Sequence, residues 1–195
     1  MAHLQDYLDA LPLAEESYPD YLQKASVYRQ FLALTPGAGL AEALPPSVRR
    51  LVTDPEPVSA WIPEVHAVAI YLSAYDVGFA DEVAYLEHWK KVNDALLGGP
   101  LYRILMRVVS PTIVLRGARS RWGNFHRGLG FHVDNLSPGN LEARLTYPVA
   151  LLPEVLAVSY TSAFQAALEL AGAREARLRV VSYTPTRTHF AGTWR

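Results

Sequence analysis

The chain has 195 residues, half of them hydrophobic, with 19% charged residues and a net charge of −1. This length and apolar content allow one good core, so we expect a single domain spanning residues 1–195. The absence of cysteine excludes disulfides, thiolate metal sites and cysteine nucleophiles, and the net charge gives no global signature of polyanion binding. No signal peptide and no stretch of about 18 apolar residues is visible, so we expect a cytoplasmic protein without membrane contact.

Prolines and glycines divide the first hundred residues into segments with helical periodicity. Apolar residues at spacings of three and four predict a helix that opens at Pro19 and ends before Pro36-Gly37. Further helical segments are predicted over residues 47–52, 62–75, 82–97 and 101–109, and Asp81 is expected to cap the fourth of these five helices.

The pattern changes after Gly123, where apolar and polar residues begin to alternate. Strands are predicted over 129–135, 140–147, 176–184 and 187–194, with a helix over 153–171. We therefore expect an α+β fold in which a helical part (1–122) packs on a four-stranded antiparallel ββαββ part (123–195). Alternation points six side chains inward: Phe131, Val133, Leu141, Leu145, Leu178 and Val180.

No motif for hydrolysis, phosphate binding or dinucleotide binding occurs, so catalytic residues are unknown. No two histidines stand three or four residues apart, and we expect no metal site. His126 and His132 lie near a predicted loop-to-strand junction, and we interpret both as exposed or half-buried polar side chains. A metal or haem ligand is the alternative interpretation of these two histidines.

An unusual feature is the stretch from Ala95 to Val133, which has six arginines and no acidic residue. Arginine suits planar contacts with carboxylate or phosphate, and its alternation with aromatic residues also suits stacking on nucleobases. The alternative is that these arginines face water or pair with acids of the N-terminal third. We expect an exposed basic face that meets an acidic partner or an anionic ligand group, with these candidate binding residues: Arg116, Arg119, Arg121, Trp122, His126 and Arg127.

Aromatic residues are numerous in the helical half, and most should belong to the core. A helical layer packed on a sheet can also leave an apolar pocket between the two layers. The candidates for lining such a pocket are Tyr71, Tyr75, Trp89 and Tyr102.

Three C-terminal segments resemble a family of uncharacterised bacterial proteins found mainly as paralogues in myxobacteria. They are SRWGNFHRG at 120–128, FHVDNLSPGNLEARL at 131–145, and the helix end and strand LAGAR-E-ARLRVV at 170–181. The resemblance covers about residues 80 to 195, and that family has no assigned activity.

The hairpin-helix-hairpin order also resembles haem-nitric oxide/oxygen-binding (H-NOX) sensors and the related vinyl-reductase-like ligand-binding domains. An H-NOX domain clamps the haem propionates with a Tyr-x-Ser-x-Arg motif, of which residues 147–151 keep only Tyr147. The segment equivalent to the helix that carries the H-NOX proximal histidine, residues 112–122, contains no histidine. The resemblance therefore implies a sensor-like fold, and we expect no cofactor and no haem.

The preferred hypothesis is a non-enzymatic sensor or binding module in signalling, which holds an apolar small molecule or an acidic protein partner. One alternative is an enzyme with a cleft lined by Glu, His and Arg side chains. Another is nucleic-acid binding through the stretch from Arg103 to Arg127, which we do not favour. A homodimer is left open.

Overall fold

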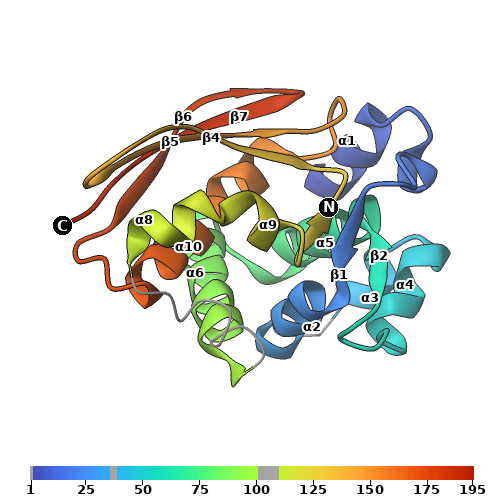
Figure 1. Ribbon diagram of the computed structural model, residues 1–195. Helices are drawn as coiled ribbons and strands as arrows, with labels where there is room; N and C mark the ends of the chain where they lie inside the picture. Colours follow the sequence, from blue (N-terminus) through green and yellow to red (C-terminus); the bar gives the residue numbers. More distant parts are fainter. Residues whose placement is uncertain (1, 36–38, 101–109) are drawn as a thin grey trace.

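The computed structural model describes residues 2–35, 39–100 and 110–195, apart from the side chains of residues 114, 116, 118 and 119. A four-stranded sheet lies across the helices, with α10 beneath it and α6 packed against α10 (Figure 1). The helix predicted over residues 101–109 lies outside the described residues.

The C-terminal sheet consists of β4 (Gly130–Ser137), β5 (Asn140–Thr146), β6 (Arg177–Thr184) and β7 (Arg187–Thr193), and α10 (Glu154–Leu170) connects β5 to β6. Every pairing is antiparallel, in the order β4-β5-β7-β6. The two strands that flank the helix in sequence are therefore not neighbours, which excludes a parallel crossover unit. The predicted α+β class, with helices packed on a four-stranded antiparallel sheet, is confirmed.

Strand alternation sorts the side chains of this sheet between its two faces. Phe131, Leu141 and Leu145 are buried, as predicted. The other three residues of the predicted inner set are only partly buried against the core: Val133, Leu178 and Val180. All three belong to β4 and β6, the edge strands, which have a neighbouring strand on one side only.

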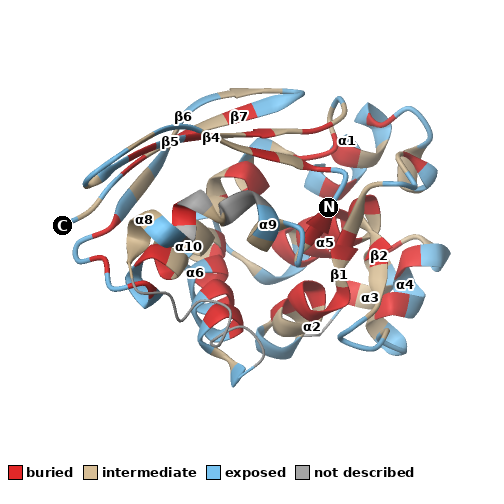
Figure 2. Ribbon diagram, viewed as in Figure 1, coloured by how far each residue is buried: buried red, intermediate tan, exposed pale blue. Residues whose placement is uncertain are grey.

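The helical part is built from two long helices, of which α5 is almost wholly buried, and several shorter ones, and Figure 2 shows the burial concentrated where they meet. None of the described helices combines the length and apolar character needed to cross a membrane. The described helices before the C-terminal sheet are, in chain order, α1 (Ala2–Ala10), the 3-10 helix η1 (Ala14–Glu16), α2 (Ala25–Leu34), α3 (Leu40–Ala43), α4 (Pro46–Thr53), α5 (Glu64–Gly78), α6 (Glu82–Gly98), α8 (Pro111–Arg116) and α9 (Ala118–Trp122).

The start of α6 follows the sequence expectation in detail. The Asp81 side chain accepts a hydrogen bond from the Ala84 backbone N–H at 2.8 Å, which satisfies one of the unpaired donors of the first turn.

The helix α5 is apolar on nearly every side and is surrounded by α1, α2, α3 and α4. Such a helix belongs in the middle of a helical layer.

A second, small sheet differs from the all-helical expectation for the first hundred residues. It has the order β2-β1-β3 and joins β1 (Leu22–Lys24), β2 (Trp61–Pro63) and β3 (His126–Arg127) in antiparallel pairs. The helix predicted to open at Pro19 begins only at Ala25, because residues 22–24 extend to pair with both neighbours. This small sheet joins β3, the strand just before the C-terminal sheet, to the helical layer.

The N-terminal helix α1 is fixed to α5 by one nearly buried carboxylate, Asp76, whose side chain is 3% exposed. It accepts hydrogen bonds from the backbone N–H groups of His3 and Leu4 at 3.2 and 3.0 Å, and from the His3 ring at 2.7 Å. Burial alone would raise the pKa of Asp76, but these hydrogen bonds hold that pKa below its ordinary value. A carboxylate from α5 thus supplies the N-terminal cap of α1.

We predict that Asp76→Asn lowers the free energy of unfolding by about 1–2 kcal/mol at pH 7, since hydrogen bonds to a charged acceptor are lost. A depressed carboxyl pKa contributes stability above the unfolded pKa and loses it as the pH falls through the folded pKa. The gap between wild type and variant should therefore close below a pH of about 4. Urea unfolding across pH measures this, with exposed Asp6→Asn as the control; a gap that persists in acid would contradict it.

Candidate functional site

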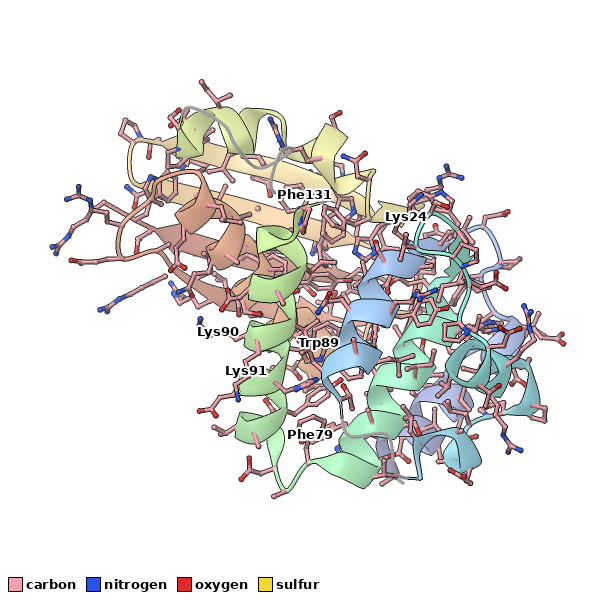
Figure 3. The ribbon with its side chains drawn as sticks, turned by 90° about the horizontal axis from the view of Figure 1, so that it is seen from below. Lys24, Phe79, Trp89, Lys90, Lys91 and Phe131 are labelled. Carbon is pink, nitrogen blue, oxygen red and sulfur yellow. The ribbon has the colours of Figure 1, made fainter. Side chains whose placement is uncertain are left out.

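A pocket of about 120 Å³ lies between the C-terminal sheet and the helices, lined by residues of α6, α10, β3 and β4 among others. It is comparable to the cavity of about 150 Å³ that holds a benzene molecule in a well-studied engineered protein. Figure 3 labels two of its lining residues, Phe131 on β4 and Trp89 on α6. Much of its lining is apolar and includes Val68, Leu96, Leu115, Phe131, Leu156 and Phe164.

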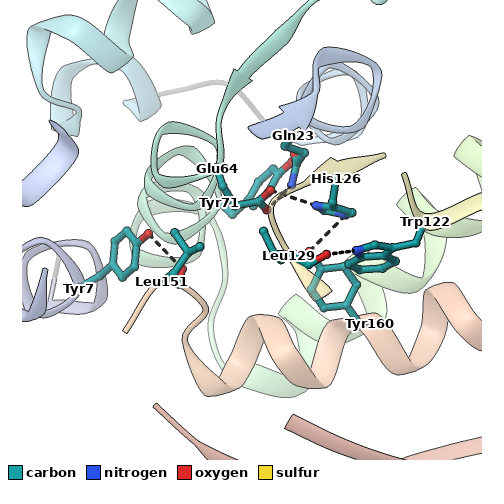
Figure 4. A network of polar contacts seen from close by, with 9 residues as sticks. All are labelled: Tyr7, Gln23, Glu64, Tyr71, Trp122, His126, Leu129, Leu151 and Tyr160. Atoms are coloured by element: carbon teal, nitrogen blue, oxygen red, sulfur yellow. Dashed lines mark hydrogen bonds and ion pairs between the residues drawn. The ribbon is translucent and has the colours of Figure 1, made fainter. Parts of the chain in front are cut away.

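One side of the pocket is polar, and it centres on the buried carboxylate of Glu64 at the start of α5 (Figure 4). Glu64 is 1% exposed; its Oε1 accepts a hydrogen bond from Gln23 Nε2 at 2.8 Å, and its Oε2 lies 3.0 Å from His126 Nδ1. A buried carboxylate needs such partners, because desolvation of an unpaired charge costs several kcal/mol. Glu64 therefore ties α5 to β1 and β3 at once.

Two tyrosines complete this polar network. The Tyr71 hydroxyl donates a hydrogen bond to Gln23 Oε1, and the Tyr160 hydroxyl lies 3.4 Å from His126 Nε2. Burial, with the nearby negative charge of Glu64 as a second cause, raises the pKa of both phenols well above the ordinary value. Both therefore stay neutral hydroxyls at any physiological pH.

The His126 imidazole is held on both its edges and its face. Nδ1 faces the Glu64 carboxylate and so carries the hydrogen of that bond, which leaves Nε2 on the side of Tyr160. The ring stacks on Trp122 with centroids 4.3 Å apart, and the Trp122 indole donates to the Leu129 carbonyl at 3.2 Å. The contact at Nε2 is the longest of these polar contacts, so Nε2 is the nitrogen that can most easily exchange its partner for a ligand.

The pocket brings together five of the ten candidate site residues, from both predicted groups: Tyr71, Trp89, Arg121, Trp122 and His126. Tyr75, one turn beyond Tyr71 on α5, instead stacks between His3 and Tyr85 and does not line the pocket. Tyr102 and the side chains of Arg116 and Arg119 lie outside the described part of the structure.

The two arginines of the predicted basic face with described side chains occupy different environments. Arg121 lines the pocket, and its guanidinium lies against Gly117, where no β-carbon intervenes. Arg127 is exposed and lies over the Trp61 ring, with its Cζ 4.0 Å from the centroid. The basic face as a whole stays a prediction.

Sequence reasoning missed the polar side of the pocket. His126 was interpreted as exposed or half-buried, and that is wrong, since it is 5% exposed and bonded to Glu64. Glu64, Gln23 and Tyr160 were not singled out at all. A charged residue inside the otherwise apolar segment 62–75 was the available signal, because buried acids are rare without a partner.

Tyr147, the residue shared with the H-NOX clamp motif, is bonded within the C-terminal sheet. Its hydroxyl lies 2.6 Å from Thr188 Oγ1 and 3.3 Å from the Thr184 carbonyl, and burial raises its pKa to about 12. Tyr147 does not line the pocket. Among the described residues that do line it, the one cation is Arg121.

No protein-family model and no curated protein matches this chain. Among solved structures it is similar to the Fe(II) unliganded H-NOX protein of K. algicida, with a TM-score of 0.60 and 9% identity over 88% of this chain and 96% of that one. It is also similar to the oxygen complex of an oxygen-binding H-NOX domain related to soluble guanylate cyclases, with a TM-score of 0.56, 8% identity, and 88% and 95% coverage. The chain therefore has the H-NOX fold over most of its length, while membership of the myxobacterial family stays a prediction.

The expectation of no cofactor needs correction. The neighbours of this fold include Fe(II) and oxygen-bound H-NOX domains, and one solved to probe heme distortion in the H-NOX family, at a TM-score of 0.55 with 7% identity and 88% and 95% coverage. The sequence argues against haem because residues 147–151 keep only Tyr147 of the clamp motif and residues 112–122 contain no histidine, but β3 carries His126 into the pocket just beyond that segment. The argument from the missing histidine therefore fails.

The chemical kinds of side chain in the pocket fit a haem. A haem iron needs only one or two axial ligands from the protein, so the absence of a described cluster of three or more metal-binding side chains has no bearing on it. His126 would hold the iron through one ring nitrogen, with Glu64 bonded to the other as a typical second partner, and Arg121 would pair with a carboxylate of the cofactor.

We predict that His126→Phe lowers the free energy of unfolding by about 3 kcal/mol, because it leaves the Glu64 carboxylate buried without its imidazole partner. The double variant Glu64→Gln/His126→Phe should recover more than half of that loss. Urea denaturation measures both, and His132→Phe on the half-exposed face of β4 serves as the control. Equal losses in the single and double variants would show that the pair carries no charge coupling.

Proposed function

We propose that this chain is a non-enzymatic sensor or binding module that holds an apolar small molecule in the pocket between α6, α10 and the C-terminal sheet. The observation that carries the proposal is the pocket itself, an apolar space with one buried polar side at His126. Such a composition is typical of small-molecule sites, in which apolar side chains supply affinity and a few polar groups fix orientation. The H-NOX fold supports the same function, since one of its solved relatives is an oxygen-binding domain.

The division of roles among the side chains follows from their placement. Trp89 and Phe164 offer flat aromatic surfaces to an apolar ligand, and His126 Nε2 receives its polar group or metal. Glu64 fixes the ring orientation of His126, and Arg121 compensates a negative group on the ligand. Haem is the candidate ligand that the fold neighbours favour, and it would supply an iron that His126 would hold.

A second candidate function is favoured by one observation, the carboxylate–histidine pair inside a pocket that also contains Arg121. Enzymes use such a pair as a general base. The hydroxyl of Ser159, which also lines this pocket, is committed to the Leu156 carbonyl at 2.8 Å, which leaves it poorly placed as a nucleophile. We therefore prefer the binding function, in which a ligand leaves the pocket chemically unchanged.

We expect the fluorescent apolar anion 8-anilinonaphthalene-1-sulfonate to bind the folded protein at one saturable site. Ala163→Phe should weaken this binding at least about tenfold, which corresponds to about 1.4 kcal/mol, because the new ring fills the pocket from α10. Fluorescence titration measures it, and Ala191→Phe on the outer face of β7 is the matched control. Equal binding in both variants would place the probe outside the pocket and contradict the proposal.

Titration with haemin identifies the ligand class. One equivalent that produces a Soret band, lost in His126→Ala and kept in His132→Ala, would assign haem and its axial ligand. A band that survives His126→Ala would contradict the role of His126. Occupancy by the apolar probe without any Soret band on haemin addition would assign a different apolar molecule to the same pocket.

A further inference from the structure

The strand β3 has only two residues, and its two side chains point to opposite sides of the small sheet. His126 faces inward, to Glu64 and the pocket, whereas Arg127 is exposed on the outer face. Strand alternation requires this, because successive side chains lie on opposite faces. The pocket and the outer surface are therefore separated by a single extended strand.

The outer face of this sheet presents two cations around one indole. Lys24 on β1 lies opposite Trp61 on β2, with its Nζ 4.5 Å from the ring centroid, and Arg127 lies over the same ring at 4.0 Å. The Lys24 ammonium also donates to the Ser59 carbonyl at 2.7 Å. Each cation–π contact is attractive, so the two side chains are held in place rather than free in solvent.

No described carboxylate forms an ion pair with Lys24 or Arg127. Two other cations of the chain do have such partners: Arg50 bonds Glu56 and Lys90 bonds Asp94. Two cations that share one ring repel each other, and a partner with carboxylates removes that cost. The surface formed by Lys24, Trp61 and Arg127, here termed the ribbon face, therefore has a charge that an acidic surface complements.

We propose that the ribbon face binds an acidic segment of a partner protein, and that this binding is coupled through β3 to occupancy of the pocket. The binding of an acidic segment is argued from the ribbon face alone, whereas the coupling rests on the proposed function. Protein carboxylates complement the two fixed positive charges of the ribbon face, and the chain as a whole, with a net charge of −1, does not attract polyanions in general. Nucleic acid would need many phosphate contacts and a wider basic surface.

The coupling follows from how β3 is held. Gln23 pairs with His126 and Leu22 with Arg127, and the Lys24 backbone N–H donates to the Phe125 carbonyl at 2.7 Å. Gln23 in turn bonds Glu64. A ligand that displaces His126 therefore moves the backbone that carries Arg127, and linkage requires that a partner on the ribbon face acts back on His126.

The surface is tested with a fluorescein-labelled oligoglutamate peptide, followed by fluorescence anisotropy at low salt. Lys24→Gln/Arg127→Gln should weaken binding at least about tenfold, while Arg177→Gln/Arg179→Gln, which removes the same charge from exposed positions of β6, should change it less than about twofold. Failure of the wild type to bind, or equal losses in the two variants, would overturn the surface. Tighter binding of an oligothymidylate through the same two residues would also overturn it in favour of nucleic acid.

The coupling is tested without any pocket ligand, by the ring carbon–hydrogen NMR signals of the histidines. Oligoglutamate should shift the His126 signal in the wild type and leave it unmoved in Lys24→Gln/Arg127→Gln. His88, buried and bonded to Thr35 Oγ1 at 2.8 Å, is the control that should not move. Peptide binding without a His126 shift would overturn the coupling alone, whereas failure of the pocket probes with an intact His126 shift would overturn the binding function alone.

Discussion

The carboxylate of Glu64 is buried at the first turn of α5, and its need for partners shapes the centre of the molecule. An ionised group in that position is stable only if each oxygen is hydrogen-bonded, and the partners come from two separate strands. Gln23 and His126 are 103 residues apart in the chain, yet they pair across β1 and β3 to meet the same carboxylate. The small sheet thus exists at the point where the helical layer and the C-terminal sheet must be joined.

This arrangement also explains why the pocket has a polar side. A pocket between a helical layer and a sheet is apolar by default, because both layers bury their hydrophobic faces there. Glu64 and His126 add a fixed, oriented imidazole to that apolar space, and the long contact at Nε2 leaves one nitrogen available. Chemistry of this kind selects a ligand by one polar or metal contact and binds the rest of it by apolar packing.

The sequence predicts the C-terminal half well, because its strands are seven or eight residues long and their alternation repeats several times. The ribbon of β1, β2 and β3 could not be predicted, since strands of two or three residues show no period. The same limit applies to the site. Aromatic residues such as Trp89 were correctly suspected at a pocket, whereas His126 appeared exposed because its partner lies 62 residues earlier in the chain.

The central claim is that the pocket holds a small molecule, and native mass spectrometry of the protein purified from its own host tests it most directly. We predict a co-purified species in addition to the bare chain, released intact on denaturation and absent from Ala163→Phe prepared in the same way. A single mass equal to the bare polypeptide, unchanged in that variant and unaltered by added haemin or apolar probe, would contradict the account.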